Sequence, residues 1–442
     1  MRLAIEAATL PPLHRAAFEA DIGVLLDLLQ AGADPNEPGC VRDECDGWNT
    51  NPGPSYVATP LMLAAASSQP KTADAVRILL QAGGDPELLS TRGDAALWFA
   101  AAAGNTRGIR VLLDGGARPD RPGANGSTPI CAAAAAHNLN GVRLLLHFGA
   151  SPHPVAIDEH DQLVGPAYSF RIPLFAAAES GSAACVQLLL SAGARAATPD
   201  IMGATALMYA STAEAIHALL AAGCPLGVRD VVARSAIDYA LEDGSPEVLF
   251  ALVGAGANIN ERDSSGLTPL LRYCSSLDIR AGMVRAAIEA GADVHAKWFH
   301  GRTALHEAVQ LFGGDRRGKL RDVVFALVEA GIDVNVGDDS LSTPLHCAVG
   351  EEGLELGAVC ALLELGADPT LKTATGKRPL DLVPAHVRSW KHIVAESPSC
   401  ICDGLDMPEN VRQRFQEEEK AGRITALTEA EEALRLLSDW RK

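Results

Sequence analysis

Aromatic residues are scarce in this chain: Phe, Trp and Tyr make up 5% of its 442 residues, although 48% of the residues are hydrophobic. Alanine and leucine supply much of the hydrophobic fraction. A core of Ala and Leu suits closely packed helices, whereas sheets favour β-branched and aromatic residues. The composition therefore predicts an all-α fold.

Basic residues are also in short supply, since the sequence has 37 Lys and Arg compared with 55 Asp and Glu, which gives a net charge of −18. Nucleic acids and anionic membrane surfaces require clustered Lys and Arg, so we expect neither as a partner. The sequence has no run of about 20 apolar residues, which is the length that a membrane-spanning helix needs. The opening "MRLAIEAATLPPLHR" does not have the pattern of a signal peptide. We expect a cytoplasmic protein.

Paired cysteines in the manner of a disulfide framework are missing as well. The ten cysteines are scattered, and several of them, such as Cys131, Cys185 and Cys274, fall within apolar, helix-like patterns. There a reduced thiol behaves as a small hydrophobic group, which fits a reducing compartment. The close pairs Cys40–Cys45 and Cys400–Cys402 predict at most a local disulfide bond.

The usual catalytic motifs are absent from the sequence, which has no Gly-x-x-x-x-Gly-Lys loop, no Gly-x-Ser-x-Gly elbow and no His-Glu-x-x-His helix. The segment "IDEHDQ" gathers Asp158, Glu159, His160 and Asp161, all of which are possible metal ligands. Consecutive loop residues rarely converge on one ion, so a solvated loop is the favoured interpretation. We expect no enzymatic activity, no metal and no cofactor.

The chain instead contains many copies of one phrase, exemplified by "TPICAAAAAHNLNGVRLLLHFGASP" and "TPLHCAVGEEGLELGAVCALLELGADP". Each copy has a Thr-Pro-Leu-like opening, an Ala-rich stretch, a Leu-Leu pair and a Gly-Ala turn. Ten full copies begin at Pro11, Thr59, Ala95, Thr128, Ile172, Thr205, Ser235, Thr268, Thr303 and Thr343. An eleventh, partial copy begins at Thr375.

Each element of the phrase has a physical role. Thr caps a helix by accepting a backbone N–H, and Pro suits the first helical position. The Ala residues keep the first helix narrow, the Leu pair forms the buried face of a second helix, and Gly ends that helix in a left-handed conformation. One such unit cannot bury its own apolar face, whereas a stack of units can.

This pattern resembles the ankyrin repeat family over about residues 8–394. His14, His306 and His346 occupy the last position of the family's Thr-Pro-Leu-His tetrapeptide, and "QAGADPN" and "GAGANIN" match its Gly-Ala-Asp-x-Asn ending. The resemblance implies an all-α repeat solenoid of stacked helix pairs with projecting β-hairpin loops. It also implies histidines bonded to neighbouring loop backbone, and protein binding through hairpin tips and the concave inner-helix face.

Some copies depart from the family pattern. Trp98, Phe175, Met208 and Asp238 replace the histidine of the tetrapeptide, and the sixth copy is short between its expected helices. Two insertions, residues 37–58 and 153–171, are rich in Pro, Gly, Asp and Asn and predict long surface loops. Such loops serve either as recognition elements or as tolerated insertions.

We divide the chain into a repeat domain, residues 1–394, and a C-terminal segment, residues 395–442. In that segment Thr428 and Glu431 form a capping-box pattern ahead of an amphipathic helix, which would cap the last repeat. Alternatively, "LDMPENVRQRF" is faintly similar to the end of a SOCS box, which would dock a ubiquitin ligase. The Leu-x-x-x-Cys signature of that box is not met, because Pro384 stands four residues after Leu380.

The segment "HAKWFHGRTALHEAV" places two aromatic residues in a turn just before a repeat. Core positions of that repeat are already filled by Ala304, Leu305 and Ala308, and exposed aromatics and Arg are typical of interface hot spots. The segment "YSFR" has a similar composition at the fifth copy. The predicted protein-binding residues are Trp298, Phe299, His300, Arg302, Tyr168, Phe170 and Arg171.

The favoured function is a non-enzymatic scaffold that binds a partner protein. The alternatives are an adaptor that docks through its C-terminal helices, and, less favoured, a metal-binding or enzymatic protein. For Trp298 itself the alternative interpretation is local packing against the adjacent hairpin.

Overall fold

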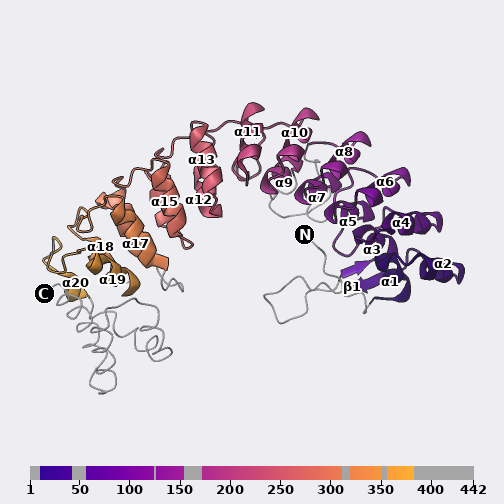
Figure 1. Ribbon diagram of the computed structural model, residues 1–442, viewed down its shortest axis with the longest axis horizontal. Coiled ribbons are helices and arrows are strands. Elements are labelled where there is room, and N and C mark those ends of the chain that lie inside the picture. The colour runs from indigo at the N-terminus through magenta and orange to yellow at the C-terminus, as the bar shows by residue number, and fades with distance from the viewer. Residues whose placement is uncertain are drawn as a thin grey trace, which may run out of the picture. The chain divides into compact units, whose positions relative to one another are not determined.

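The computed structural model describes residues 10–41, 56–123, 126–153, 172–310, 319–349 and 356–382 (Figure 1). The chain divides into two compact units, unit 1 (Met1–Ala236) and unit 2 (Ile237–Lys442), which are treated separately below. The predicted boundary near residue 394 and the expected C-terminal helices lie outside the described residues, as do residues 42–55 and 154–171 of the two insertions.

In unit 1, short helices follow one another in pairs, and successive pairs lie side by side (Figure 1). The elements of unit 1 are α1 (Pro12–Glu19), α2 (Ile22–Gln30), β1 (Gly39–Val41), β2 (Tyr56–Ala58), α3 (Pro60–Ala66), α4 (Thr72–Gln81), α5 (Ala96–Ala102), α6 (Thr106–Asp114), α7 (Pro129–Ala135), α8 (Leu139–His147), α9 (Pro173–Glu179), α10 (Ala183–Ser191) and α11 (Ala213–Ala221).

Unit 2 repeats the same arrangement. Its elements are α12 (Ala236–Asp243), α13 (Pro246–Gly254), α14 (Pro269–Cys274), α15 (Ala281–Glu289), the 3-10 turn η4 (Phe299–Gly301), α16 (Ala304–Gln310), α17 (Lys319–Glu329), α18 (Pro344–Ala348), α19 (Leu356–Glu364) and α20 (Pro379–Leu382). The all-α repeat architecture expected from the sequence is thus confirmed for the described residues.

Outside the sixth copy, the helices begin and end where the repeated phrase predicts. In α3, Pro60 is the first residue and the Thr59 hydroxyl accepts the backbone N–H of Met62 at 3.4 Å. Pro at this position costs nothing, because the first N–H groups of a helix have no intrahelical partner. After α4, Gly83 has φ 91°, a backbone conformation that residues other than glycine rarely adopt. The chain reverses there and leaves the stack.

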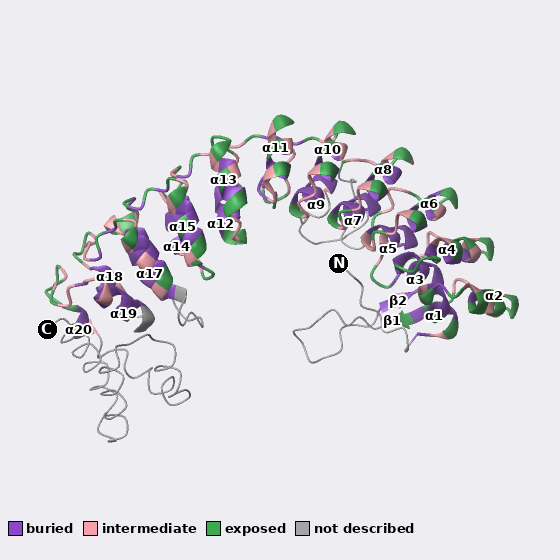
Figure 2. Ribbon diagram, viewed as in Figure 1, coloured by how far each residue is buried: buried purple, intermediate pink, exposed green. Residues whose placement is uncertain are grey.

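Alanine and leucine form the core in both units (Figure 2). Ala100 and Ala101 of α5 are fully buried, as are Leu79 of α4 and Leu112 of α6. The small Ala side chains let the first helix of one repeat lie close to that of the next, while the Leu side chains fill the space beneath the second helices. Most of the stabilisation therefore comes from contacts between repeats.

The two ends of the first insertion pair as antiparallel strands β1 and β2, with Gly39 opposite Ala58. Gly39 lies against the ring of His14, where a Cβ atom would come within 2.5 Å of Nε2. On β2, Tyr56 is buried and stacks on Phe99 with ring centroids 6.1 Å apart. These strands are therefore packed onto the stack as part of the fold.

The histidine of the tetrapeptide ties its repeat to the next loop, as expected. His306 Nδ1 accepts the backbone N–H of Thr303 at 3.2 Å, and Nε2 lies 3.0 Å from the carbonyl oxygen of Ser342. Because Nδ1 accepts, the proton is on Nε2 and the buried ring is neutral. His346 makes the same bonds to Thr343 and Lys377.

His14 makes one of these bonds and not the other. Its Nε2 lies 3.1 Å from the carbonyl oxygen of Ala58, but its Nδ1 has no hydrogen-bond partner. The sequence explains the difference, because Pro11 stands where Thr303 and Thr343 stand in the later repeats. Proline has neither the N–H nor the hydroxyl that those residues offer.

Asparagines of the Gly-Ala-Asp-x-Asn ending form a second link between repeats. Asn36 Nδ2 donates to the carbonyl of Gly83 at 3.0 Å, and its Oδ1 accepts the N–H of Asp85 at 2.8 Å. Asn260 and Asn335 make the same pair of bonds to the repeats that follow them. Two bonds from one side chain fix the spacing of adjacent loops.

The sixth copy departs from the expected helix pair. Thr205 to Ala210 form a turn and not a helix, and α11 begins soon afterwards with Thr212 as its N-cap, accepting the N–H of Ala215 at 3.3 Å. The copy is too short to hold a full first helix, because the cap of the second helix follows immediately. A helix of one turn fixes several residues for a single hydrogen bond and is unfavourable.

We predict that His306 makes the stability of the protein pH-dependent. Burial lowers the pKa of His306 to about 4, whereas the unfolded chain has an ordinary value of about 6.5. The neutral ring therefore contributes fully above about pH 6.5, and that contribution, roughly 3 kcal/mol, is lost progressively as the pH falls from about 6.5 to about 4. Urea unfolding at about pH 7 and about pH 4.5 measures the loss.

Two variants separate this effect from the titration of other groups. His306→Gln should show a smaller loss of stability between the two pH values than the unchanged protein. His300→Gln, which changes an exposed histidine, should behave like the unchanged protein. Equal pH dependence in all three proteins would contradict the assignment.

Candidate functional site

The predicted binding residues of unit 2 lie on a five-residue turn that closes the loop between two repeats. The N–H of Trp298 donates to the carbonyl of Arg302 at 2.8 Å, and the N–H of Gly301 donates back to the carbonyl of Trp298 at 2.9 Å. Lys297 and Thr303 pair across its base as an isolated antiparallel bridge. We call this arrangement a tip turn.

Tip turns with the same backbone bonds recur along the chain. They begin at Ser90, Gly123, Asp200, Asp230, Asp263, Trp298, Asp338 and Thr373.

Four of these turns begin with an aspartate, whose carboxylate accepts hydrogen bonds from backbone N–H groups of the same turn. They are the turns that begin at Asp200, Asp230, Asp263 and Asp338. In the third of them, Asp263 Oδ1 accepts the N–H groups of Ser265 at 2.7 Å and Leu267 at 2.9 Å. The carboxylate therefore satisfies two backbone donors that would otherwise be unpaired, and it fixes the turn before any partner arrives.

Trp298 stands at the position of this aspartate and stabilises its turn differently. An indole has no acceptor, so it cannot bind the N–H groups within its own turn. Its Nε1 instead donates to the carbonyl of Ser265, in the preceding tip turn, at 3.0 Å. The side chain is half-buried, so Trp298 links two adjacent loops while part of its ring remains accessible.

Phe299 and His300 form the exposed end of the turn. Phe299 is 64% exposed, and the ring of His300 lies against it with centroids 3.9 Å apart. His300 has φ 58°, a left-handed conformation uncommon for residues with a side chain. The carbonyl of His300 accepts a hydrogen bond from the N–H of Asp339, in the next tip turn, at 2.8 Å. The next tip turn therefore holds the backbone that carries the two rings.

Arg302 is directed back into the protein. Its Nε lies 3.2 Å from Oε1 of the buried Glu307, although the two groups are not aligned for a hydrogen bond and the attraction is electrostatic. The hydroxyl of Ser275 donates to the other carboxylate oxygen of Glu307 at 3.2 Å. The Arg302 side chain is 18% exposed and is already paired with Glu307. Little of it is therefore available for contact with another protein.

The other predicted contact residues, Tyr168, Phe170 and Arg171, lie outside the described residues, as does the "IDEHDQ" segment. The structure therefore brings together the Trp298–Arg302 part of the predicted site. Over the described residues no group of three or more His, Cys, Asp or Glu is placed to hold a metal ion. Among the same residues, no helix is long and apolar enough to cross a membrane.

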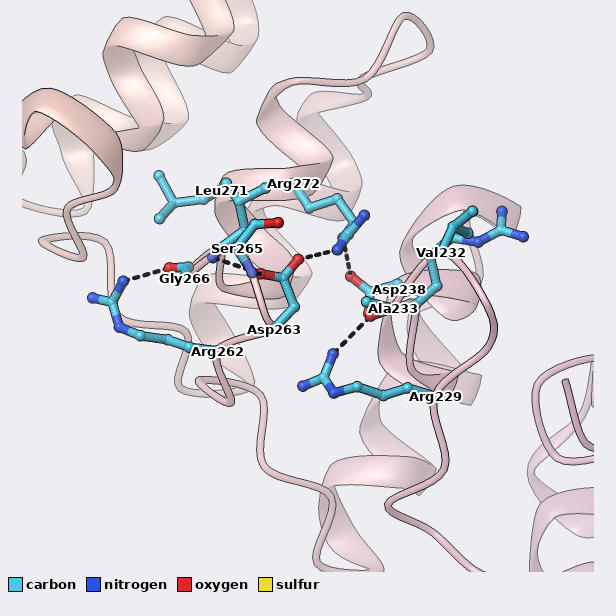
Figure 3. Close-up of polar contacts among 12 residues, drawn as sticks. Arg229, Val232, Ala233, Asp238, Arg262, Asp263, Ser265, Gly266, Leu271 and Arg272 are labelled. Carbon is cyan, nitrogen blue, oxygen red and sulfur yellow. Dashed lines mark hydrogen bonds and ion pairs between the residues drawn. The ribbon is translucent and has the colours of Figure 1, made fainter. Parts of the chain in front are cut away.

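The sequence analysis did not anticipate a charged network in unit 2 (Figure 3). Asp238, at the histidine position of its tetrapeptide, lies 3.4 Å from Nε of Arg272, and the same guanidinium donates to the carboxylate of Asp263. Both carboxylates are buried. The ion pair replaces the histidine-to-loop bond of other repeats, and the signal for it was an aspartate at that position followed one repeat later by an arginine.

The thiols that the sequence placed in helices behave as small hydrophobic groups. Cys131 is fully buried, and burial raises its pKa to about 11. Burial also raises the pKa of Cys347 to about 11. A thiol with such a pKa remains protonated near neutral pH and is a poor nucleophile.

We predict that Arg272→Leu destabilises unit 2 by about 3 kcal/mol, because it removes a cation that pairs with two buried carboxylates. Arg285→Leu is the matched control: this arginine is exposed, and its nearest carboxylate, Glu329, is 3.9 Å away, so the change should cost no more than about 0.5 kcal/mol. Urea unfolding compares the two. Similar losses would show that the network contributes no more than a surface pair.

We also predict that Trp298 and Phe299 differ in their effect on stability. Trp298→Phe removes the N–H bound to Ser265 and should cost about 1 kcal/mol. Phe299→Ala, at an exposed position one residue away, should change the free energy of unfolding by no more than about 0.5 kcal/mol. The reverse order in thermal or urea unfolding would show that Phe299 is the structural residue.

Comparison with known proteins agrees with this geometry. The family model for "Ankyrin repeats (3 copies)" matches residues 61–156, 155–230 and 237–338, and that for "Ankyrin repeat" matches residues 341–374. The putative ankyrin repeat protein YahD of Escherichia coli (strain K12) is 32% identical over 146 residues, which cover 32% of this chain and 68% of that protein.

Other relatives match over shorter stretches. Oxysterol-binding protein-related protein 1 of Rattus norvegicus is 40% identical over 85 residues, 19% of this chain and 8% of that protein. Ankyrin repeat and SOCS box protein 9 of Homo sapiens is 44% identical over 64 residues, 14% of this chain and 21% of that protein. The chain thus spans a small part of the length of these two relatives.

Among solved structures, the ankyrin repeat domain of human ASB11 aligns with 62% of this chain and 99% of that chain, at 18% identity and a TM-score of 0.37. The assignment depends on the family models, which together match more than half of the sequence and follow the repeats described above. The chain belongs to the ankyrin repeat family.

Proposed function

We propose that this protein is a non-enzymatic scaffold that binds a partner protein, and that the Trp298 tip turn is one of its contact sites. The observation that carries the proposal is the pair of exposed rings, Phe299 and His300, on a backbone whose hydrogen bonds are already made. An exposed phenylalanine on a fixed turn loses little conformational entropy on binding.

The contacts behind the turn support the same function. The carbonyl of Lys297 accepts a hydrogen bond from Nη1 of Arg262 at 2.9 Å, and the carbonyl of Ser265 accepts one from the indole N–H of Trp298. A Cβ atom on Gly301 would come within 2.4 Å of the Asp339 side chain. The turn is therefore packed on both sides along the row of tips, while its end faces solvent. Preorganised aromatic groups of this kind are common anchors of protein interfaces.

The four residues of the site have different roles in this proposal. Phe299 and His300 make the direct contacts, and Trp298 contributes one accessible side of its ring. Arg302 acts through Glu307 to hold the start of α16, since most of its side chain is covered. Tyr168, Phe170 and Arg171 remain predicted contacts.

We predict that Phe299→Ala weakens partner binding about 30-fold or more, as expected for a hot-spot anchor worth about 2 kcal/mol. The partner is captured from the native cell with the tagged full chain, and its affinity for each variant is then measured by titration. Leu277→Ala is the control, because Leu277 is 70% exposed but lies in the loop between α14 and α15. Equal binding by the two variants would exclude the Trp298 tip turn as a contact site.

The adaptor alternative has one supporting observation, the similarity to Ankyrin repeat and SOCS box protein 9. That similarity covers 14% of the chain, and repeats alone are sufficient to account for it. Comparing the full chain with a chain that ends at Val394 tests the alternative. Ubiquitin-ligase subunits that co-purify with the full chain, and not with the shorter one, would favour the adaptor function.

A further inference from the structure

The second helices of three consecutive repeats in unit 1, α4, α6 and α8, lie side by side (Figure 1). Each carries an arginine at the same position, because Arg77, Arg110 and Arg143 follow one another at intervals of 33 residues. All three residues are exposed, as is Arg107, one turn before Arg110 on α6. We call these four residues the arginine surface.

Contacts between α6 and α8 show that the two helices are in register. Each has an N-cap asparagine whose side-chain oxygen accepts the N–H of the third helical residue, at 2.8 Å in α6 and 2.9 Å in α8. A Cβ atom on Gly141 of α8 would lie 3.0 Å from Cδ1 of Ile109 of α6, so these parts of the two helices touch. Arg110 follows Ile109, and Arg143 is two residues beyond Gly141, so the two arginines occupy equivalent places on neighbouring helices.

Three of the four guanidinium groups have no carboxylate partner. Arg77 pairs with Asp74 at 2.8 Å, and both side chains are more than half exposed, so this pair is weak and readily exchanged. In the part of the chain that the structure describes, Arg107, Arg110 and Arg143 form no ion pair.

The other charged groups of these helices do not cancel the arginines. Within the bounds of α4, α6 and α8 the acidic residues are Asp74, which is paired, and Asp114, the exposed last residue of α6. The last helix, α8, has no acidic residue and ends at the exposed His147. Four arginines thus stand against two aspartates on this part of a chain whose net charge is −18.

The acidic groups in the loops that follow these helices already have partners. The carboxylate of Glu87 pairs with Arg118 at 2.7 Å and with Arg121 at 3.0 Å. Asp85 and Asp120 each accept a backbone N–H at 2.8 Å. The excess of positive charge therefore lies on the helices, ahead of these loops.

The placement of these arginines opposes the local stability of α6. Arg107 stands in the first turn, where the helix dipole favours an acidic residue, and that turn has none. Arg107 and Arg110 are three residues apart and repel each other. In unit 2 the equivalent residue of α15, Arg285, has Glu329 within 3.9 Å. Residues that break a local rule without a compensating contact indicate a binding role.

We propose that the arginine surface binds an acidic α-helix of a partner protein, which lies across α4, α6 and α8. Packed neighbouring helices are about 8–10 Å apart, and seven residues of an α-helix rise about 10.5 Å. A partner helix with a glutamate at every seventh residue therefore brings one carboxylate to each of Arg77, Arg110 and Arg143. Arginine and carboxylate form strong, often bidentate, hydrogen bonds.

The surroundings favour this partner over a nucleic acid or an anionic membrane. Charges more than about 8–10 Å away are largely screened at physiological salt, so the local arginines decide what binds here. A phosphate backbone carries its charges much more densely and needs a longer run of cations than four arginines among aspartates. The inference extends the proposed scaffold function, but it does not depend on the Trp298 tip turn as a contact site.

The test uses the full chain and a fluorescein-labelled peptide of about 22 residues. It is rich in alanine, which favours a helix, and carries glutamate at every seventh residue and again one turn later. Fluorescence anisotropy at about 0.1 M salt measures its binding. We expect the unchanged protein to bind, Arg110→Glu to bind at least tenfold more weakly, and Arg143→Glu and the milder Arg110→Gln to bind several-fold more weakly.

Matched controls separate the arginine surface from general charge effects. Arg285→Glu makes the same change at the equivalent position of α15 in unit 2 and should bind like the unchanged protein, as should Phe299→Ala. A peptide of the same composition, with its glutamates spread around the helix, should bind several-fold more weakly. A DNA duplex of about 20 base pairs, and vesicles of phosphatidylserine and phosphatidylcholine, should not bind.

Four outcomes of the peptide measurements would overturn the proposal. These are failure of the unchanged protein to bind, equal binding by Arg110→Glu, an equal loss in Arg285→Glu, and equal binding of the rearranged peptide. DNA or vesicles that bind more tightly than the peptide, and less tightly to Arg110→Glu, would assign the surface to that partner instead.

The Phe299→Ala variant distinguishes this inference from the proposed contact site. Loss of peptide binding in that variant would assign the peptide to the Trp298 tip turn and overturn the proposal. Failure of the peptide experiment leaves the capture experiment with Phe299→Ala unaffected, so the two proposals are tested separately.

Discussion

A buried polar side chain that finds its partner in the next repeat is the interaction on which this structure depends. His306 reaches the carbonyl of Ser342, and His346 reaches that of Lys377. A buried imidazole without that carbonyl would carry an unsatisfied N–H, which costs more than a hydrogen bond normally contributes. Repeats that carry this histidine therefore need their neighbour for polar satisfaction as well as for burial of their Leu and Ala side chains.

The first repeat and the repeat of Asp238 differ from this pattern at the histidine position. In the first repeat Pro11 leaves His14 with its bond to the next loop alone. Asp238 takes the place of histidine in another repeat, and Arg272 brings the compensating charge together with Asp263. Where this position holds a polar side chain, as at His306, His346 and Asp238, the next repeat carries its partner, whereas the apolar Phe175 and Met208 are buried in the core. Polar side chains at this position are therefore constrained in pairs.

Helix positions and the repeat architecture could be predicted because their signals are local. Thr, Pro and Gly act within a few residues of where they stand, as the caps of α3 and the turn at Gly83 illustrate. The sixth copy shows where local signals are insufficient. Thr205 begins a plausible helix-start phrase, but the cap of α11 follows before a first helix can form, so chain length between caps decided the outcome.

The candidate site could be placed on a tip turn from sequence, but its side-chain orientations could not. Alignment with the repeat put Phe299 at the end of the turn. It did not indicate that the indole of Trp298 would bond to the preceding turn, or that Arg302 would turn back toward Glu307. Those contacts depend on residues far away in sequence.

The aspartates inside the tip turns have a consequence for how this protein changes over time. In the four turns that contain one, the aspartate and the backbone hydrogen bonds hold the turn, as Asp200 and Asp230 show. In these two turns the side chains of the second and third residues take no part in those hydrogen bonds and are exposed. Selection can thus exchange them one by one, from serine to valine to phenylalanine, and alter what the protein recognises while the architecture stays intact.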